Sequence, residues 1–392
     1  MIQFFKKVKS NYSIFFNTQN SKILKNYFTS FLNLFLRVSL SLIAIPILSN
    51  TPDILAIYSI CISLGFFFKY SDFGFIAAGR KYAAEHVISS NFNLQLRFLG
   101  NSYSFTFIVS LFLSVTLFII SFYPEIIISE LELNKEYKFI ASVLIKALSI
   151  SNIFQVFTNY ISTFFEVNLK KYYCDIISIF SAIVSFFLFF VIDKTNQNWI
   201  LIYFISLKIM DLIALIGLLF MSKKVFKIKP IKLFQNFRIR KKLLKKGLKL
   251  SLASIIVSIS AFLFHELDNL FLAKNMDLSL ISYFSIAVLG PYVLKTIFSL
   301  LYSPFSSIFN YIKNDKQLFK DYFNKIIIFF FPIIFTGIII VSFFSREIIF
   351  SYVGFEYNNS IAPFIYLCLS LSFSFIIFPI LVISANLIVI AL

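Results

Sequence analysis

The chain has 392 residues, of which 59% are hydrophobic and only 14% are charged. Soluble domains carry about a quarter charged residues, so this composition excludes an ordinary soluble protein and indicates an integral membrane protein. The net charge of +18 would suit an acidic partner, but in a membrane protein the distribution of charge along the chain carries more information than its sum.

Apolar runs of about 20 residues, the length that crosses a bilayer, recur along the whole sequence. Polar and apolar residues do not alternate within them, which disfavours a β-barrel. The sequence therefore predicts an all-α, polytopic bundle of ten transmembrane helices. The predicted spans are residues 27–48, 54–78, 98–121, 138–165, 173–192, 199–221, 247–272, 279–306, 325–344 and 361–386.

A strongly basic stretch separates the sixth span from the seventh. Residues 223–249 contain twelve Lys or Arg and no acid. Such a run can bind nucleic acid, but its position between membrane spans predicts instead a cytoplasmic linker against anionic membrane lipids. The predicted domains are an interfacial N-terminal segment (1–26), a lobe of six helices (27–221), the linker (222–246) and a lobe of four helices (247–392).

Basic residues also concentrate in alternate loops. The N-terminal segment and the loops after the second, fourth, sixth and eighth spans are rich in Lys and Arg, whereas the opposite loops hold acids such as Glu130 and Glu356. Lys and Arg stay on the cytoplasmic side. We therefore expect both termini on the cytoplasmic side of a cell inner (plasma) membrane.

Two segments on either side of the linker are similar to each other. LSNTPDILAIYSICISLGFFFK, ending at Lys69, aligns with LAKNMDLSLISYFSIAVLGPYVLK, ending at Lys295. An acid, a tyrosine and a glycine match: Asp53 with Asp277, Tyr58 with Tyr283, and Gly65 with Gly290. An internal repeat of this kind predicts two related helical lobes with a transport site between them.

Five basic residues fall within the predicted spans: Arg37, Lys69, Lys146, Lys208 and Lys295. A cation at the bilayer centre costs about 3 kcal/mol or more, so each should face a bundle interior or a wet cavity. Lys69 and Asp72, like Lys208 and Asp211, stand three residues apart, so each pair can neutralise itself. The other three cations have no acid within one turn. They pair across helices, with Glu266 or Asp268, or bind an anionic ligand, which we favour.

The seventh span carries a polar cluster: His265, Glu266, Asp268 and Asn269. Two interpretations stay open for it, a polar rim at the outer interface and a coupling site for a proton or Na⁺, in which Asp72 and Asp211 are further candidates. Only two histidines occur, the three cysteines are far apart, and no nucleotide-binding or hydrolase motif is present. We therefore expect no metal site, no cofactor, no catalytic residue and no enzyme activity.

Three segments carry a resemblance to a known family: FFFKYSDFGFIAAGRKYAAEH after the second span, FHELDNLFLAKNMDLSLISYFSIAVLGPYVLKTIFSLLYSPFSSIF, and FSREIIFSYVGFEYNNSIAPFIYL. In order and spacing they resemble Wzx-type polysaccharide flippases of the multidrug/oligosaccharidyl-lipid/polysaccharide (MOP) exporter superfamily. Members usually have twelve or more spans, so the resemblance implies a second lobe that is incomplete here.

The resemblance implies export of an undecaprenyl-diphosphate-linked oligosaccharide for surface polysaccharide, O-antigen or lipopolysaccharide assembly, beside other polysaccharide-assembly proteins. Such a head group would move by alternating access through a cavity lined by the five cations. One alternative is a membrane enzyme of polyprenyl-linked glycan assembly (polymerase, ligase or glycosyltransferase), which the short outer loops disfavour. Another is a multidrug exporter of the same superfamily, which would favour acids in its cavity. The glycan and the coupled ion stay open.

Overall fold

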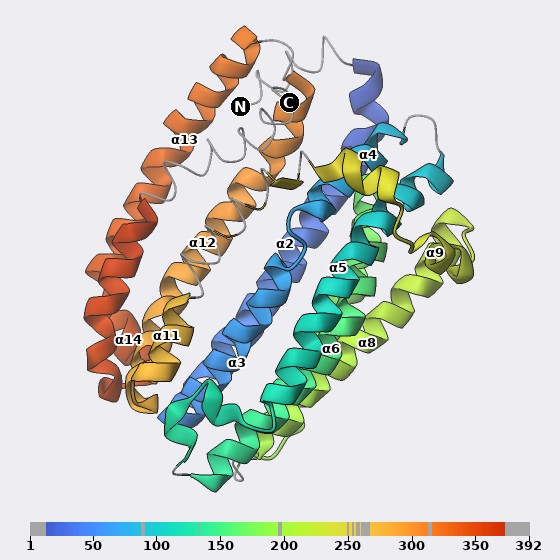
Figure 1. Ribbon diagram of the computed structural model, residues 1–392. Coiled ribbons are helices and arrows are strands. Elements are labelled where there is room, and N and C mark those ends of the chain that lie inside the picture. The colour runs from blue at the N-terminus through green and yellow to red at the C-terminus, as the bar shows by residue number, and fades with distance from the viewer. Residues whose placement is uncertain are drawn as a thin grey trace. The chain divides into compact units, whose positions relative to one another are not determined.

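The computed structural model describes residues 13–372, except 88–90, 133, 195–197, 249–250, 253–254, 256–258, 260–266 and 313–315. Within this part the chain is helical and contains no strand (Figure 1). The helices are α2 (Ser13–Ser49), α3 (Pro52–Tyr70), α4 (Phe75–Glu85), α5 (Phe92–Ile120), α6 (Lys135–Val167), α7 (Tyr172–Val191), α8 (Trp199–Phe226), α9 (Pro230–Asn236), α11 (Leu267–Asn275), α12 (Leu278–Ile312), α13 (Lys316–Phe343) and α14 (Ser345–Val353), with short 3₁₀ turns η1 (Pro124–Ile126), η2 (Ser129–Glu132) and η3 (Phe355–Ser360).

Seven helices in the described part are long and apolar enough to cross a membrane, so the chain is a multi-pass membrane protein with the predicted all-α fold. Their apolar parts are Lys25–Ser49, Phe92–Ile120, Lys135–Val167, Tyr172–Val191, Trp199–Phe226, Leu278–Phe298 and Phe323–Phe343. These ranges coincide with the first, third to sixth, eighth and ninth predicted spans. The seventh and tenth predicted spans, 247–272 and 361–386, lie mostly outside the described residues.

The second predicted span, 54–78, is wrong as a single helix. Helix α3 ends at Tyr70, and α4 begins at Phe75. Between them the Ser71 hydroxyl donates a hydrogen bond to the Phe68 carbonyl (2.7 Å), and the backbone turns through positive φ at Phe73 (45°) and Gly74 (72°). The sequence Ser-Asp-Phe-Gly contains residue types that favour a turn at the end of a helix. The apolar residues on both sides of it led to the prediction of one continuous span.

Contacts divide the chain into two compact units. The first unit contains Met1–Leu40, Phe75–Leu111 and Ser151–Lys246, and the second contains Ser41–Gly74, Phe112–Ile150 and Gly247–Leu392. The boundary passes through the middle of α2, α5 and α6 and therefore differs from a boundary at the basic linker. The predicted lobes 27–221 and 247–392 stay a prediction.

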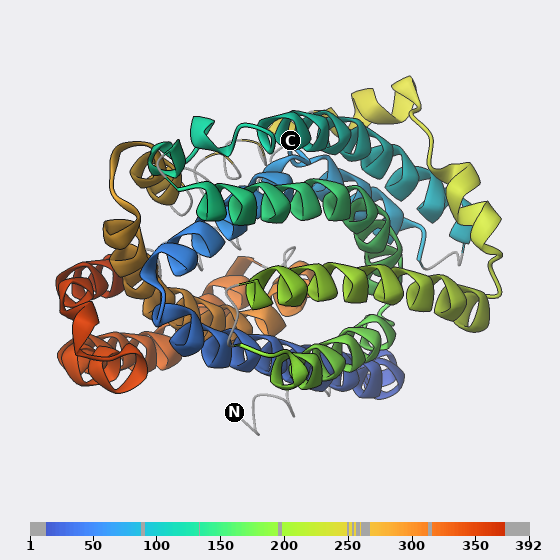
Figure 2. The ribbon, with the colours of Figure 1, turned by 90° about the horizontal axis from the view of Figure 1, so that it is seen from below.

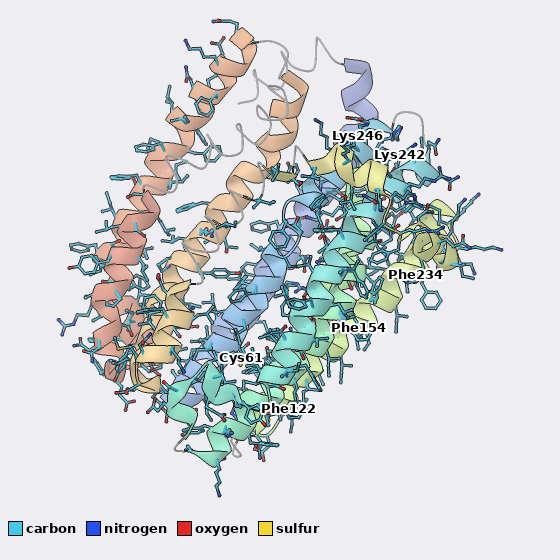
Figure 3. The ribbon with its side chains drawn as sticks, in the orientation of Figure 1. Cys61, Phe122, Phe154, Phe234, Lys242 and Lys246 are labelled. Atoms are coloured by element: carbon cyan, nitrogen blue, oxygen red, sulfur yellow. The ribbon has the colours of Figure 1, made fainter. Side chains whose placement is uncertain are left out.

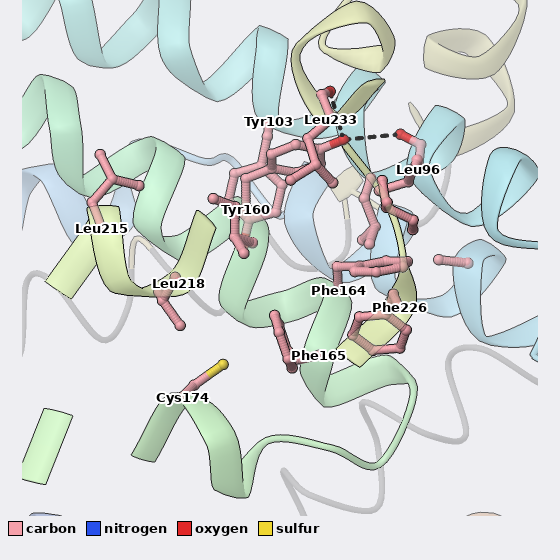
Figure 4. Packing of buried hydrophobic residues seen from close by; sticks show 14 of the residues in the cluster. Leu96, Tyr103, Tyr160, Phe164, Phe165, Cys174, Leu215, Leu218, Phe226 and Leu233 are labelled. Carbon is pink, nitrogen blue, oxygen red and sulfur yellow. Dashed lines mark hydrogen bonds between the residues drawn. The ribbon is translucent and has the colours of Figure 1, made fainter. Parts of the chain in front are cut away.

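The core of the first unit is built from aromatic residues of α5, α6 and α8. Tyr103, Tyr160, Phe164 and Phe165 are fully or almost fully buried there (Figure 4). The Tyr160 hydroxyl lies 3.2 Å from the carbonyl oxygen of Leu233, which satisfies its buried polar tip. On another side of this unit α7 and α8 run side by side (Figure 2).

In the second unit, α3 packs against α12 and α11, and α12 also contacts α13 and η3. Helices α3 and α12 carry the two copies of the predicted repeat. Their matched glycines both lie at close contacts. A Cβ atom on Gly65 would stand 3.3 Å from Leu148 Cδ1, and one on Gly290 would stand 2.2 Å from the ring of Phe364. The repeat thus falls on two helices that pack together, where a small residue is needed in each.

Candidate functional site

Three charged residues of the predicted site come together in the first unit. Lys208 and Asp211 lie one turn apart on α8, and Arg37 lies on α2, close enough for the charges of all three to interact. Arg37 is exposed and Lys208 is half-buried. The cluster has two cations and one acid. It therefore retains an excess positive charge within the apolar part of the bundle.

Neighbouring side chains hold the two cations of this cluster. The Arg37 Nε atom donates a hydrogen bond to Asn33 Oδ1, one turn earlier on α2 (3.2 Å). The Lys208 ammonium lies 5.0 Å from the centre of the Phe204 ring, a cation–π contact. The acid near Arg37 is Asp211, whereas the sequence offered Glu266 or Asp268 as partners across helices. A guanidinium and an ammonium fixed in this way can present several N–H donors to one anion.

Helix α2 is held against α7 by a buried carboxylate that the predicted site did not include. Asp175, in the first turn of α7, accepts hydrogen bonds from the hydroxyls of Ser30 (2.6 Å) and Thr29 (3.2 Å). The Asn26 side chain accepts a hydrogen bond from the Tyr172 N–H group (2.8 Å). Because α7 packs on α8, these contacts fix Arg37 of α2 near Lys208 of α8.

The remaining predicted cations belong to the second unit. The Lys146 ammonium lies 4.5 Å from the centre of the Phe122 ring, so this lysine has a cation–π partner that its own helix does not provide. Lys295 on α12 and Asp72 in the turn after α3 are half-buried. The side chain of Lys69 lies outside the described part. The structure brings Arg37 and Lys208 together, and the ligand-binding role of all five cations stays a prediction.

Of the predicted coupling residues on the seventh span, His265 and Glu266 lie outside the described residues. Asp268 is exposed in the first turn of α11. The neighbouring Asn269 is buried, and its side-chain nitrogen donates a hydrogen bond to the Ser63 hydroxyl of α3 (2.8 Å). Its Oδ1 atom has no hydrogen-bond partner in the described part of the chain. A half-satisfied buried amide is costly, which makes Asn269 a residue of interest that charge patterns did not single out.

Several hydrogen bonds in the second unit join residues from before and after the basic linker. The Glu130 carboxylate accepts the backbone N–H of Leu278, the first residue of α12. The Ser129 hydroxyl donates to the Lys274 carbonyl (3.0 Å), and the Tyr357 hydroxyl donates to the Ser49 carbonyl (2.9 Å). We call these three contacts and the Ser63–Asn269 bond the outer contacts, because the sequence predicts this end to face outward. Three of the four use a backbone group, which no sequence pattern reveals.

An ion pair closes the loop between α5 and α6 in the same unit. Lys138 Nζ lies 2.9 Å from the Glu125 carboxylate. A backbone N–H hydrogen bond and the hydrogen bond from Lys138 hold the pKa of Glu125 below its usual value. The carboxylate therefore stays ionised at neutral pH and keeps this loop closed on α6.

Solved structures with a similar arrangement of helices identify the fold. Two are described as the inward-facing and the outward-facing conformations of a multidrug resistance MATE family transporter of the MOP superfamily, and one as MATE in the bent conformation. The inward-facing structure has a TM-score of 0.54 and 15% identity over 91% of this chain and 80% of that chain. The outward-facing one has a TM-score of 0.57 and 14% identity over 90% and 79%. The chain has the MATE transporter fold.

This MATE fold is shared without close sequence similarity. The match to the bent structure has a TM-score of 0.53 and 14% identity, and it covers 90% of this chain and 79% of that chain. No family model matches the sequence, and no curated protein matches it either. The MATE structures are transporters, and they have been captured facing either side of the membrane, which is consistent with alternating-access transport.

Proposed function

We propose that this protein is a flippase that moves a polyprenyl-diphosphate-linked oligosaccharide from the cytoplasmic to the outer leaflet of a bacterial inner membrane. The observation that carries the proposal is the cluster of Arg37, Lys208 and Asp211, with its excess positive charge inside a MOP-type transporter fold. Cations at membrane depth are costly unless an anion offsets their charge. A diphosphate head group provides one and can accept several charge-assisted hydrogen bonds at once.

Each residue of the cluster has a role in this proposal. The planar guanidinium of Arg37 binds two phosphate oxygens side by side, and the Lys208 ammonium adds a point charge beside it. Asp211 limits repulsion between the two cations when no substrate is bound. Its carboxylate also weakens substrate binding, so the head group can leave again.

Transport then requires alternating access. The head group binds from the cytoplasm while the polyprenyl chain stays in lipid, and the outer contacts, including Ser63–Asn269, separate to release it outward. The membrane potential assists this direction, because moving negative charge out of a negative interior releases roughly 2.3 kcal/mol per charge per 100 mV. A proton or Na⁺, bound by Asp72, Asp211 or Asp268, is the proposed counter-ion if the potential alone does not suffice.

A multidrug exporter is the second candidate. Asp211 can bind a cationic drug, and two of the similar structures are described as multidrug resistance transporters. The excess of cations in the cluster favours an anionic substrate. Two of the similar solved structures are described as transporters, which favours transport over an enzyme of glycan assembly.

The test is transport by the purified protein in liposomes. A fluorescent polyprenyl-diphosphate disaccharide is placed in the outer leaflet of the liposomes, and an impermeant quencher is added outside. Flipping is measured as the fraction of fluorescence that the quencher can no longer reach. We expect flipping by the wild type, a loss of at least tenfold in Arg37→Gln and Lys208→Gln, and little change in the control Lys223→Gln, an exposed residue near the end of α8. Efflux of a cationic dye without any flipping would favour the multidrug exporter instead.

A further inference from the structure

The described part of the basic stretch (residues 223–249) packs against the first unit. Helix α8 ends where Lys227 adopts a left-handed conformation (φ 56°), and α9 begins at Pro230. Leu233 of α9 is fully buried, and its carbonyl accepts the hydrogen bond of Tyr160. The backbone of α9 comes so close to α5 that a Cβ atom on Gly100 would stand 2.2 Å from the Asn236 carbonyl oxygen.

The residues after α9 are docked as well. The Arg240 backbone N–H donates a hydrogen bond to Asn101 Oδ1 of α5 (2.5 Å). Residues 241–248 are helical, and the Lys246 carbonyl accepts a hydrogen bond from Tyr82 of α4 (3.1 Å). The Lys246 ammonium lies 4.3 Å from the centre of the Tyr82 ring. The stretch is therefore held against α4, α5 and α6 by these contacts.

The exposed side chains of this segment are both apolar and basic, and among them the ring of Phe234 also packs edge-on against Phe157 of α6, with 5.7 Å between ring centres. Ile231 is 67% exposed, Phe234 43% and Ile239 42%. The basic side chains around them are exposed too: Lys229, Lys232, Arg238, Lys241, Lys242 and Lys245. No acid occurs between residues 223 and 249. Phe234 projects from α9, and Lys242 and Lys246 lie on the following helix (Figure 3).

An open pocket of about 460 Å³ lies at the start of this segment. It is lined by Asn91, Phe92 and Asn93 at the start of α5, by Phe226, Lys227 and Ile228 at the end of α8, and by Lys232 of α9. Two ammonium groups and two amides can donate hydrogen bonds into it, whereas Phe226 and Ile228 in its wall are buried. The lining therefore suits a phosphate group, and the exposed apolar side chains of α9 lie beside it.

We propose that this pocket and the exposed face of α9 form a binding site for an anionic phospholipid of the cytoplasmic leaflet. Lys227 and Lys232 bind the lipid phosphate, while Ile231 and Phe234 insert beside its acyl chains. Exposed isoleucine and phenylalanine side chains favour lipid over nucleic acid, which offers no apolar phase to bury them. Because α9 is fixed to α5 and α6, the bound lipid contacts the transport bundle directly. The proposal does not depend on which substrate the protein carries.

The first test measures lipid binding to the purified full chain by native mass spectrometry. We expect phosphatidylglycerol to bind in preference to phosphatidylcholine, and Lys227→Gln/Lys232→Gln to weaken phosphatidylglycerol binding by about tenfold or more. The matched control is Lys223→Gln/Lys224→Gln, which removes the same charge from exposed residues outside the pocket and should stay within about twofold of the wild type. Equal losses in both double variants, or no preference for phosphatidylglycerol, would overturn the proposal.

A second measurement asks whether α9 touches acyl chains. The native Cys61, Cys174 and Cys368 are buried. A thiol-reactive fluorophore should therefore label only the introduced cysteine in Ile231→Cys or Phe234→Cys. In liposomes, phosphatidylglycerol with brominated acyl chains should quench both positions. An unquenched label at both positions contradicts insertion. Binding of inorganic diphosphate in the pocket, with no lipid bound under the same conditions, contradicts a lipid as the occupant.

Discussion

Arg37 and Lys208, whose charges interact with each other and with Asp211, form the cationic pair on which the proposed substrate depends. Both residues lie within apolar runs, so the sequence predicts that each charged side chain faces a polar environment inside the bundle. Spacing along α8 also brought Asp211 next to Lys208. That Arg37 joins them depends on the packing of α2 beside α7 and α8, through contacts such as Asp175 with Ser30. These contacts connect residues far apart in sequence, so no local pattern predicts them.

Asp211→Asn tests the role of the acid in the cluster. Removing its charge leaves Arg37 and Lys208 without compensation, so an anionic substrate should bind about tenfold more tightly, a change of roughly 1.4 kcal/mol. Turnover should fall, because release becomes slower. Binding is measured with the fluorescent polyprenyl-diphosphate probe. Weaker binding of that probe would show that Asp211 supports the site and does not oppose the substrate.

Asp175→Ala tests a structural role. The change removes a buried carboxylate that accepts hydrogen bonds from the half-buried hydroxyls of Thr29 and Ser30, and the free energy of unfolding should fall by about 1–3 kcal/mol. Thermal unfolding in detergent measures the loss, and Glu347→Gln on the exposed face of α14 is the control. An unchanged melting temperature in Asp175→Ala would mean that α2 is held by its other contacts.

Among the secondary-structure elements, the long helices were predicted well from continuous apolar runs, and the interruptions between them poorly. The apolar runs located α5 to α8 because length and hydropathy decide them. The turn after Tyr70 was not predicted because its polar residues, Ser71 and Asp72, lie between two apolar runs that together have the length of one span. The docking of α9 was not predicted because the charges of that stretch indicated a linker. Its buried face consists of few residues, among them Leu233, which a charge count does not detect.

Gly100→Ala tests the docking of α9. A methyl group there collides with the Asn236 carbonyl, so α9 must move, at a cost of about 1–3 kcal/mol. Gly337→Ala on α13 is a matched control, because its added Cβ would stand 3.6 Å from Phe298, an ordinary contact. Thermal unfolding and protease cleavage within residues 229–240 are compared for both variants. Equal stability and equal cleavage would contradict tight docking of α9 on α5.

At the scale of the whole molecule, the sequence predicted a two-lobed helical transporter, and the MATE fold agrees with it. The repeat contributed to this prediction, because the two similar segments lie on α3 and α12, which pack against each other. The outer contacts could not be predicted, since three of the four use a backbone group and the fourth joins Ser63 of α3 to Asn269 of α11. Which substrate binds depends on the assembled cavity, and the sequence indicates the substrate only through the charges of its residues.

A cross-link between α3 and α11 tests alternating access. Ser63→Cys with Asn269→Cys places two thiols where a hydrogen bond of 2.8 Å now joins the side chains. Joining them with a short bifunctional thiol reagent that a reductant can cleave should stop transport, and the reductant should restore it. Each single cysteine variant, treated in the same way, is the control. Full transport by the cross-linked protein would mean that these helices need not separate.

If the cationic cluster selects an anionic lipid-linked glycan, the charge of the lipid head group decides which lipid is flipped. Liposomes containing the wild type, or the double variant Arg37→Gln/Lys208→Gln, receive either the polyprenyl-diphosphate disaccharide or the same disaccharide on an uncharged lipid. We predict rapid flipping of the diphosphate lipid by the wild type alone, faster when the potential is negative at the face from which the lipid starts. Equal flipping of both lipids, or full activity of the double variant, would contradict the account.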